Sequence, residues 1–178
     1  MANLQQYSAK ICYTAAGMLI HQDKTLLIHH KKLNLWLCPG GHIEDGELPH
    51  QAAEREFKEE TGVAVVAYDP FYTRNSKMTE YVPSPVETNL HWISEQNYLE
   101  RSKDPIAYAK APTRMKGCEQ HVGFLYLVRA TGLLDLQPQE DEVLQVRWVS
   151  QAEIKNFDLT DDMQAQLRHG FALAEGSS

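Results

Sequence analysis

Residues 41–63 read GHIEDGELPHQAAEREFKEETGV, a glycine-rich loop that leads into a highly charged segment. Pro49 suits the first turn of a helix, and the chain from Gln51 to Thr61 is rich in alanine, glutamate, arginine and lysine. Gly62 is placed to end such a helix. The sequence therefore predicts a helix of about three turns at Gln51–Thr61.

One face of this predicted helix is strongly acidic. Glu56, Glu59 and Glu60 are three and four residues apart, so they share a face, whereas Ala53 and Phe57 turn toward a core. Like charges at this spacing destabilise a helix by about 0.2–0.5 kcal/mol per pair, so the carboxylates need solvent or a cation. Magnesium prefers oxygen ligands and can bridge carboxylates to a substrate phosphate.

Arg55 offers a second way to offset this negative charge. Its guanidinium can pair with Glu47 in the loop or with Glu59 one turn further on, and either pair would brace the loop against the helix. The alternative interpretation of a glutamate-rich helix is a solvated surface. The spacing of the whole stretch argues against that alternative.

Five residues separate Gly41 from Glu47, and seven more precede the pair Arg55-Glu56. This spacing resembles the Nudix box, as does the preceding sequence LWLCPGG. The defining positions of the box are all filled here, by Gly41, Glu47, Arg55, Glu56, Phe57, Glu59, Glu60, Gly62 and Val63. The resemblance implies an α/β fold, the α/β/α sandwich with a mixed central sheet, as a single domain over residues 1–178.

The resemblance also implies an activity and a set of site residues. The activity is attack of water on phosphorus in a nucleoside diphosphate linked to another moiety, with Mg²⁺ or Mn²⁺ as cofactor. Divalent metals suit this chemistry because they neutralise phosphate oxygens and lower the pKa of the attacking water. The implied metal ligands are Glu56, Glu59, Glu60 and the backbone carbonyl of Gly40.

The general base is open between two glutamates. Glu56 lies in the box, and Glu142 lies in an acidic turn before Trp148, where some family members place a further carboxylate. Glu140 and Asp141 compete with Glu142, and a solvated acidic loop is the alternative. Glu119 is a weaker candidate.

Substrate selection is expected from residues 74–117, an irregular insertion with four prolines, seven Lys/Arg and five Asp/Glu. Loops are predicted there, with short strands or a helix turn as a further possibility. Tyr81 in this segment and His42 in the box loop are candidate substrate contacts. His42 could equally hydrogen-bond only within its loop. The whole segment could instead be a structural insertion or a dimer contact.

The composition of the chain limits the classes of partner that we expect it to bind. The formal net charge of −7, without a long Lys/Arg run, argues against a dedicated nucleic-acid surface, so a small nucleotide is the expected partner. The chain contains no apolar stretch of membrane-spanning length, and its polar start lacks a signal-peptide pattern. Cys12, Cys38 and Cys118 show no metal-site spacing and are expected to be free thiols, which favours the cytoplasm. A homodimer is compatible with the sequence.

The remaining elements follow from periodicity. Strands are predicted at residues 11–21, 25–32, 63–68, 121–132 and 142–150, with 71–73 as an extension, and the first two strands are joined by a turn. A last helix is predicted at residues 151–157 or 161–174.

Three further functions remain as alternatives to small-nucleotide hydrolysis. A non-catalytic nucleotide sensor on the same fold would typically have lost box carboxylates, and this chain has kept them. An isomerase of the isopentenyl diphosphate type would use a cysteine, but Cys38 stands within the lead-in to the box. Hydrolysis at an RNA end is opposed by the acidic balance, although the basic segment is compatible with it.

Overall fold

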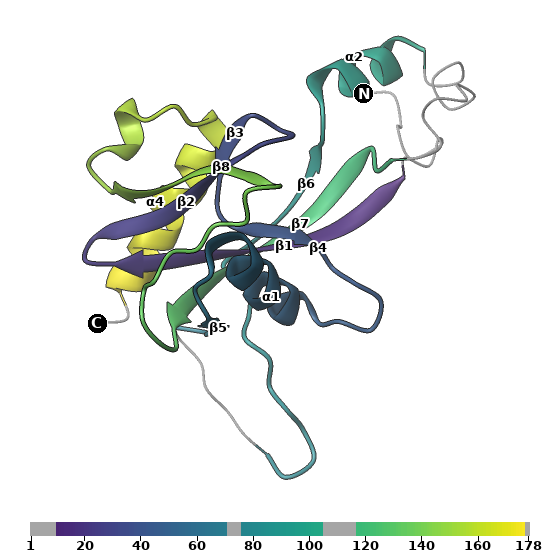
Figure 1. Ribbon diagram of the computed structural model, residues 1–178. Coiled ribbons are helices and arrows are strands. Elements are labelled where there is room, and N and C mark those ends of the chain that lie inside the picture. Colours follow the sequence, from purple (N-terminus) through teal and green to yellow (C-terminus); the bar gives the residue numbers. More distant parts are fainter. Residues whose placement is uncertain (1–9, 71–75, 105–116, 177–178) are drawn as a thin grey trace.

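The computed structural model describes residues 10–70, 76–104 and 117–176, and it has strands and helices in mixed order (Figure 1). The strands are β1 Ile11–His21, β2 Lys24–His30, β3 Leu35–Leu37, β4 Gly40–His42, β5 Val65–Ala67, β6 Glu87–Trp92, β7 Gln120–Ala130 and β8 Val143–Ser150. The helices are α1 Pro49–Thr61, α2 Glu95–Lys103, α4 Asp161–Glu175 and the short 3₁₀ helix η3 Ile154–Asn156.

Strands β1 and β7 form the centre of the sheet. They run parallel, with paired residues from Ile11↔Gln120 to Leu19↔Val128. The other edge of β7 pairs antiparallel with β5 and β6, and β1 pairs antiparallel with β4. The sheet is therefore mixed, as predicted.

The second half of the sheet is built on β2. This strand follows β1 through the turn at Gln22 and Asp23, which have positive φ angles of 50° and 57°. It then pairs antiparallel with β3 on one edge and with β8 on the other. The predicted pair of adjacent first strands is confirmed.

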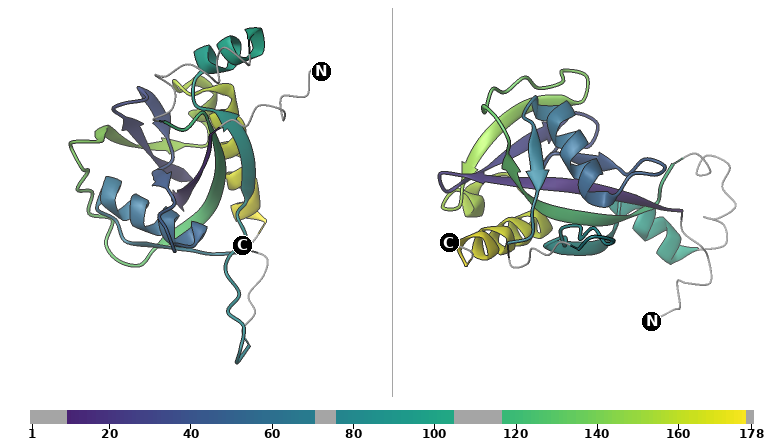
Figure 2. Two further views of the ribbon diagram at one scale, coloured as in Figure 1. Left: turned by 90° about the vertical axis from the view of Figure 1, so that its right-hand side faces the viewer. Right: turned by 90° about the horizontal axis from the view of Figure 1, so that it is seen from below.

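Helices α1 and α4 cover opposite faces of the sheet (Figures 1 and 2). Under α1, Phe57 packs into a cluster with Ala15 and Tyr126, and the predicted burial of Ala53 and Phe57 is confirmed. Under α4, Leu167 packs with Met18. The sheet therefore has an apolar core on each face, one under α1 and one under α4. This is the predicted α/β/α sandwich.

The segment predicted to be irregular contains two regular elements, β6 and α2. Strand β6 extends the sheet beside β7, and α2 follows it beyond the end where β1 begins (Figure 2). The chain between residues 76 and 86 instead projects away from the sheet (Figure 1). The predicted strand extension at 71–73 lies outside the described residues. Both ranges offered for the last helix have a counterpart, in η3 and α4.

The prediction of three free thiols is wrong for two of the cysteines. Cys12 and Cys118 form a disulfide, although 106 residues separate them, with their Cα atoms 5.8 Å apart. The parallel pairing of β1 with β7 starts beside both residues and brings them together. Cys38 is free and buried, and burial raises the pKa of its thiol to about 12. The disulfide removes the cysteine argument for a reducing compartment.

No helix in the described parts of the chain has both the length and the apolar character needed to cross a membrane.

Candidate active site

Helix α1 is anchored at both ends and at its middle. The Leu48 N–H donates to Gln51 Oε1 (3.0 Å) at the start, two residues before the predicted helix. At the other end Gly62 has a φ of 80°, and its N–H donates to the Lys58 carbonyl (2.8 Å). Glu54 Oε1 accepts from the Ala67 N–H (2.9 Å), which ties the helix to β5. These contacts fix which face of α1 turns toward the box loop.

Arg55 is the hub of the loop–helix contact. Its guanidinium makes five hydrogen bonds: two to Glu47 (2.9 and 3.0 Å), one each to Glu56 (2.8 Å) and Glu59 (3.1 Å), and one to the His42 carbonyl (3.0 Å). Five is the full donor capacity of an arginine side chain. Both partners that the sequence offered, Glu47 and Glu59, are therefore engaged at once. The hydrogen bonds from Arg55 lower the pKa of Glu47.

Glu60 lies in the most buried position of the acidic face. It is 1% exposed, and its Oε2 accepts from the Gly40 N–H (2.8 Å). Its pKa is raised to about 8, chiefly by burial and also by the charges of Glu56, Glu142 and Glu59, while the hydrogen bond from the Gly40 N–H acts in the opposite direction. The sequence predicted the face on which Glu60 lies but not its burial.

The three helix carboxylates differ in their surroundings. The Glu56 side chain is 14% exposed, and burial raises its pKa despite the bond to Arg55, while the charges of Glu59 and Glu142 raise it further. The Glu59 side chain is 51% exposed. The acidic face therefore runs from solvent at Glu59 to the protein interior at Glu60.

Two glycines allow the backbone to approach this face. A Cβ at Gly40 would lie 2.5 Å from the Ala15 carbonyl oxygen and 2.6 Å from Ala16 Cα in β1. A Cβ at Gly41 would overlap the Glu56 carboxylate. Only glycine therefore lets β4 lie between β1 and the acidic helix face.

Glu142 lies in the turn before β8, as expected, and contributes to the same negative field. Its charge is among those that raise the pKa values of Glu56 and Glu60. Its Oε1 is 3.9 Å from Lys32 Nζ, and its backbone carbonyl accepts from the Lys31 N–H (2.8 Å).

The other candidate residues are placed elsewhere. The His42 ring turns away from the carboxylates, with Nε2 3.5 Å from Cys118 Sγ. Tyr81 is 39% exposed in the projecting segment. Glu119 forms an ion pair with the buried Arg101 (2.6 Å) and accepts from the Lys10 N–H (2.9 Å), so its oxygens serve to join α2 to β7.

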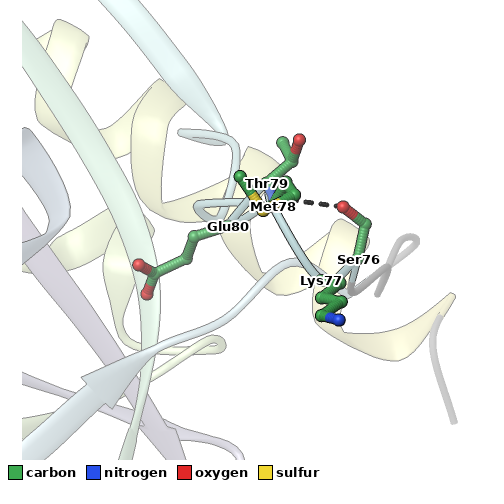
Figure 3. Close-up of a pocket in the computed structure, with 5 residues that line it drawn as sticks. All are labelled: Ser76, Lys77, Met78, Thr79 and Glu80. Atoms are coloured by element: carbon green, nitrogen blue, oxygen red, sulfur yellow. Dashed lines mark hydrogen bonds between the residues drawn. The ribbon is translucent and has the colours of Figure 1, made fainter.

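Two surface hollows differ in their relation to the box. One, of about 510 Å³, lies against the box loop and is lined by Cys12, Tyr13, His42, Ile43, Glu44, Asp45, Gly46, Glu47, Pro49 and Phe124. The other, of about 460 Å³, is formed by the five consecutive residues Ser76–Glu80, where the Thr79 N–H donates to Ser76 Oγ (3.0 Å) (Figure 3). The second hollow is lined only by residues of the projecting segment. The hollow beside the box loop is therefore the better candidate for binding substrate.

The acidic side chains of the box offer the oxygen atoms that a hard divalent cation prefers, although no three of them bring ligand oxygens within 4.8 Å of one another in the described parts of the chain. The charges of Glu59 and Glu142 raise the pKa values of Glu56 and Glu60, and Arg55 and Lys32 are the cations that contact members of this group in the described structure. These carboxylate oxygens, exposed at Glu59 and buried at Glu60, match the preference of Mg²⁺ or Mn²⁺ for carboxylate ligands.

The mixed sheet between α1 and α4, with the box on the loop and helix beside β1, defines a Nudix-type α/β protein. Residues 13–170 match the family described as the NUDIX domain, so this chain belongs to the Nudix family.

Known relatives agree with this assignment. An 8-oxo-dGTP diphosphatase of Proteus vulgaris is 36% identical over 61 residues, 32% of this chain and 54% of its own length, so the chain spans about half of that relative. Phosphatase NudJ of Escherichia coli K12 is 22% identical over 80% of this chain and 71% of its own. A hydrolase of the NUDIX family from Clostridium perfringens superposes with a TM-score of 0.64 at 24% identity, covering 91% of this chain and 95% of that one.

Three features of the site were not predicted from the sequence. They are the burial of Glu60, the engagement of Glu119 by Arg101, and the proximity of His42 to the cysteines. Each depends on contacts between β4, or the residue before β7, and distant parts of the chain. No local pattern in the sequence predicts such contacts.

Proposed function

We propose that this protein hydrolyses a phosphoanhydride bond in a nucleotide derivative, a nucleoside diphosphate linked to another moiety, with Mg²⁺ or Mn²⁺ as cofactor. The proposed metal ligands are Glu56, Glu59, Glu60 and the Gly40 carbonyl. The observation that carries the proposal is the acidic face of α1, in which Glu60 is 1% exposed and retained beside three other carboxylates. Burial of an uncompensated carboxylate is costly, so this arrangement favours a cation site over a solvated surface.

The chain's own residues supply orientation and proton transfer. Arg55 holds Glu47, Glu56 and Glu59 in one arrangement, and the Gly40 N–H holds Glu60. When bound, the divalent metal would neutralise phosphate oxygens and lower the pKa of the attacking water. Glu56 and Glu142 both remain candidates for the base that accepts the water proton. The raised pKa of Glu56 favours it for that role near neutral pH.

The hollow beside the box loop is the proposed position of the substrate. Glu47 and His42 line it, so a phosphate chain that entered it would lie close to the loop that precedes α1. Tyr81 remains a candidate substrate contact from the projecting segment. The acidic net charge of −7 favours a small nucleotide over an RNA end.

The test is a panel of substrates with Mg²⁺ or Mn²⁺, with EDTA as control. Two members are suggested by relatives, 8-oxo-dGTP by the Proteus vulgaris diphosphatase and a diadenosine polyphosphate by an Ap4A hydrolase of Caenorhabditis elegans. The others are nucleoside triphosphates, ADP-ribose, NADH, nucleotide sugars and capped RNA. Metal-dependent cleavage of one class would support the proposal and name the substrate. Preference for capped RNA would favour the RNA-end alternative, and binding without turnover would favour a sensor.

A pair of matched variants on α1 tests the metal ligands. Glu59→Gln is expected to lower kcat by several orders of magnitude with little change in thermal unfolding, because it removes a charge that would hold the metal. Glu54→Gln is the control, since the substituted amide keeps an oxygen to accept the Ala67 N–H and Glu54 points toward β5. Near-normal turnover and unchanged metal dependence in Glu59→Gln would show that the ligand assignment is wrong.

Two properties of the whole protein belong to the proposal as well. The cytoplasm remains the proposed location, now without support from the cysteines. A homodimer remains a proposal from the sequence alone. Size-exclusion chromatography with light scattering would determine the oligomeric state.

A further inference from the structure

The end of the sheet where β1 begins gathers sulfur and imidazole groups. Cys12 in β1 is the register partner of His121 in β7, and His121 is the partner of His91 in β6. Residues directly opposite each other on neighbouring strands have side chains on the same face. His42 joins this group because its partner in β1 is Thr14, two residues after Cys12.

Three of these side chains are close enough to bind one metal ion together. The two cysteine Sγ atoms and a ring nitrogen of His42 all lie within 4.8 Å of one another. The distance from His42 Nε2 to Cys118 Sγ is 3.5 Å. Two ligands of one tetrahedral zinc ion are about 3.5 Å apart, given zinc–sulfur and zinc–nitrogen bonds of ~2.3 and ~2.0 Å.

His121 supplies an independent observation. Its Nε2 is buried and has no hydrogen-bond partner among the described residues, although buried polar atoms are usually paired. Its ring makes an edge contact with the His42 ring, with centroids 5.0 Å apart. His121 lies outside the group of three whose ligand atoms are all within 4.8 Å of one another, but its unpartnered nitrogen belongs to a ring in contact with His42 and is therefore available as a fourth ligand.

We propose that reduction of the Cys12–Cys118 disulfide creates a site for a soft divalent metal ion, Zn²⁺, with Cys12, Cys118, His42 and His121 as ligands. Two thiolates and two imidazoles form a tetrahedral donor set that zinc prefers and magnesium does not. Cys12 and Cys118 are half-buried and His42 is exposed, so an ion can enter from solvent. The disulfide and the metal site are alternative states of one pair of sulfur atoms.

The conversion between the two states balances with a dithiol as reductant. Thiol–disulfide exchange breaks the Cys12–Cys118 bond and closes a disulfide in the dithiol, which loses two electrons and two protons to the protein. The two cysteines become thiols. Zinc then displaces both thiol protons, which pass to solvent.

This site adjoins the box through His42. The ring of His42 faces the cysteines, and its backbone carbonyl accepts from Arg55, the residue that holds the box carboxylates. A metal ion bound to the His42 ring would therefore restrict the position of this residue, which directly follows Gly41. The metal site does not depend on the proposed hydrolysis, because its ligands are sulfur and nitrogen and those of the box are oxygen.

Cobalt substitution tests the site directly. The full chain is reduced with a dithiol, freed of reductant without oxygen, and titrated with Co²⁺. A thiolate-to-cobalt charge-transfer band in the near ultraviolet is expected with a stoichiometry of one, and Zn²⁺ should abolish it. Cobalt bound to the box carboxylates gives no such band, so the readout separates the two sites. The oxidised protein should give no band either.

Matched variants locate the ligands. Cys38→Ala should keep the band, because Cys38 is buried elsewhere, and Cys12→Ser/Cys118→Ser should lose it. His121→Ala in the reduced protein should weaken Zn²⁺ binding at least tenfold in competition with a chelating dye, and it leaves both sulfurs in place. A reduced wild-type protein without the band, or a band that survives in the double variant, would overturn the proposal.

Discussion

Glu60 is the residue whose surroundings differ most from those of an ordinary surface glutamate. Its carboxyl group is buried, receives one N–H from Gly40, and lies near three other acidic groups. The fold thus keeps a carboxyl group at a position where neither water nor a neighbouring cation would fully balance its negative charge. A protein that uses this position only for stability would gain by replacing it with an apolar residue.

Glu60 predicts how the stability of the metal-free protein depends on pH. Its folded pKa, about 8, lies above the ordinary value of 4.5, so its contribution is fully present below pH 4.5 and lost as the pH rises through 8. In EDTA, the melting temperature of the wild type should therefore fall more between pH 5 and pH 8.5 than that of Glu60→Gln. Thermal unfolding by circular dichroism measures both, and parallel curves would contradict this account.

The hydrogen bonds of Arg55 predict that even the conservative substitution Arg55→Lys lowers the stability of the protein. Arg55→Lys keeps the charge but cannot reproduce five hydrogen bonds in a planar fork, and a charged hydrogen bond contributes about 1.5–3 kcal/mol. We expect the free energy of unfolding in urea to fall by about 1–3 kcal/mol.

Arg147→Lys is the control for Arg55→Lys. Arg147 pairs with Glu153 at 3.7 Å, with both side chains about half exposed, and its guanidinium lies 4.9 Å from the centroid of the Phe157 ring. Exposed contacts of both kinds contribute little, and lysine keeps the charge that they use. A change of less than about 0.5 kcal/mol is expected there. Equal losses in the two variants would mean that the Arg55 network does not brace the loop.

At the scale of elements, the approach of β4 to β1 positions the site. Gly40 and Gly41 together let a three-residue strand lie between the central strand and α1. The box loop is thus held by backbone pairing on one side and by carboxylates on the other.

This arrangement predicts a large effect from one added methyl group. Gly40→Ala would press its Cβ against the Ala15 carbonyl, so β4 must shift and the Gly40 N–H must leave Glu60. We expect a loss of about 1–3 kcal/mol in the free energy of unfolding, together with at least a tenfold loss of kcat. Gly132→Ala is the matched control, because a Cβ there meets no atom within 4 Å. A soluble Gly40→Ala protein with wild-type stability would contradict the steric argument.

The sequence predicted the local elements well, because their signals are local. The helix at the box has proline at its start and glycine at its end, and the hairpin of β1 and β2 has apolar strands around a polar turn. Strands β3 and β4, of three residues each, were not predicted. Short strands or a helix turn were considered in the region of β6 and α2 but could not be placed, because ETNLHW in β6 does not alternate apolar and polar residues and the strand is held by β7.

At the scale of the molecule, the long-range pairing of β1 with β7 accounts for what the sequence could not predict. It brings Cys12 beside Cys118, and it places Glu119 where Arg101 can reach it. The register between two strands more than 100 residues apart cannot be read from the pattern of residues in either strand. The acidic face of α1 could be predicted because all its members lie within two helical turns.

The disulfide gives a prediction for the whole molecule. It closes a loop of 106 residues, and a crosslink of this kind commonly stabilises a protein by about 2–4 kcal/mol. A dithiol should therefore lower the melting temperature of the wild type and of Cys38→Ala by several degrees in EDTA.

The variant Cys12→Ser/Cys118→Ser supplies the control for this prediction. It should melt at the same temperature with and without the dithiol, because it has no crosslink to lose. Equal melting temperatures for the oxidised and reduced wild type would show that the crosslink does not stabilise the fold.

The central position of β7 also bears on how the protein is made. The box is complete once residue 63 has been synthesised, but β1 lacks its parallel neighbour until residues 120–128 have left the ribosome. Contacts so distant in sequence slow folding, because a long loop must close before they form. The nascent chain therefore carries its acidic segment without the surrounding sheet while residues 64–120 are being added. Residues 1–70 alone are not expected to fold, so the catalytic geometry is acquired late and all at once.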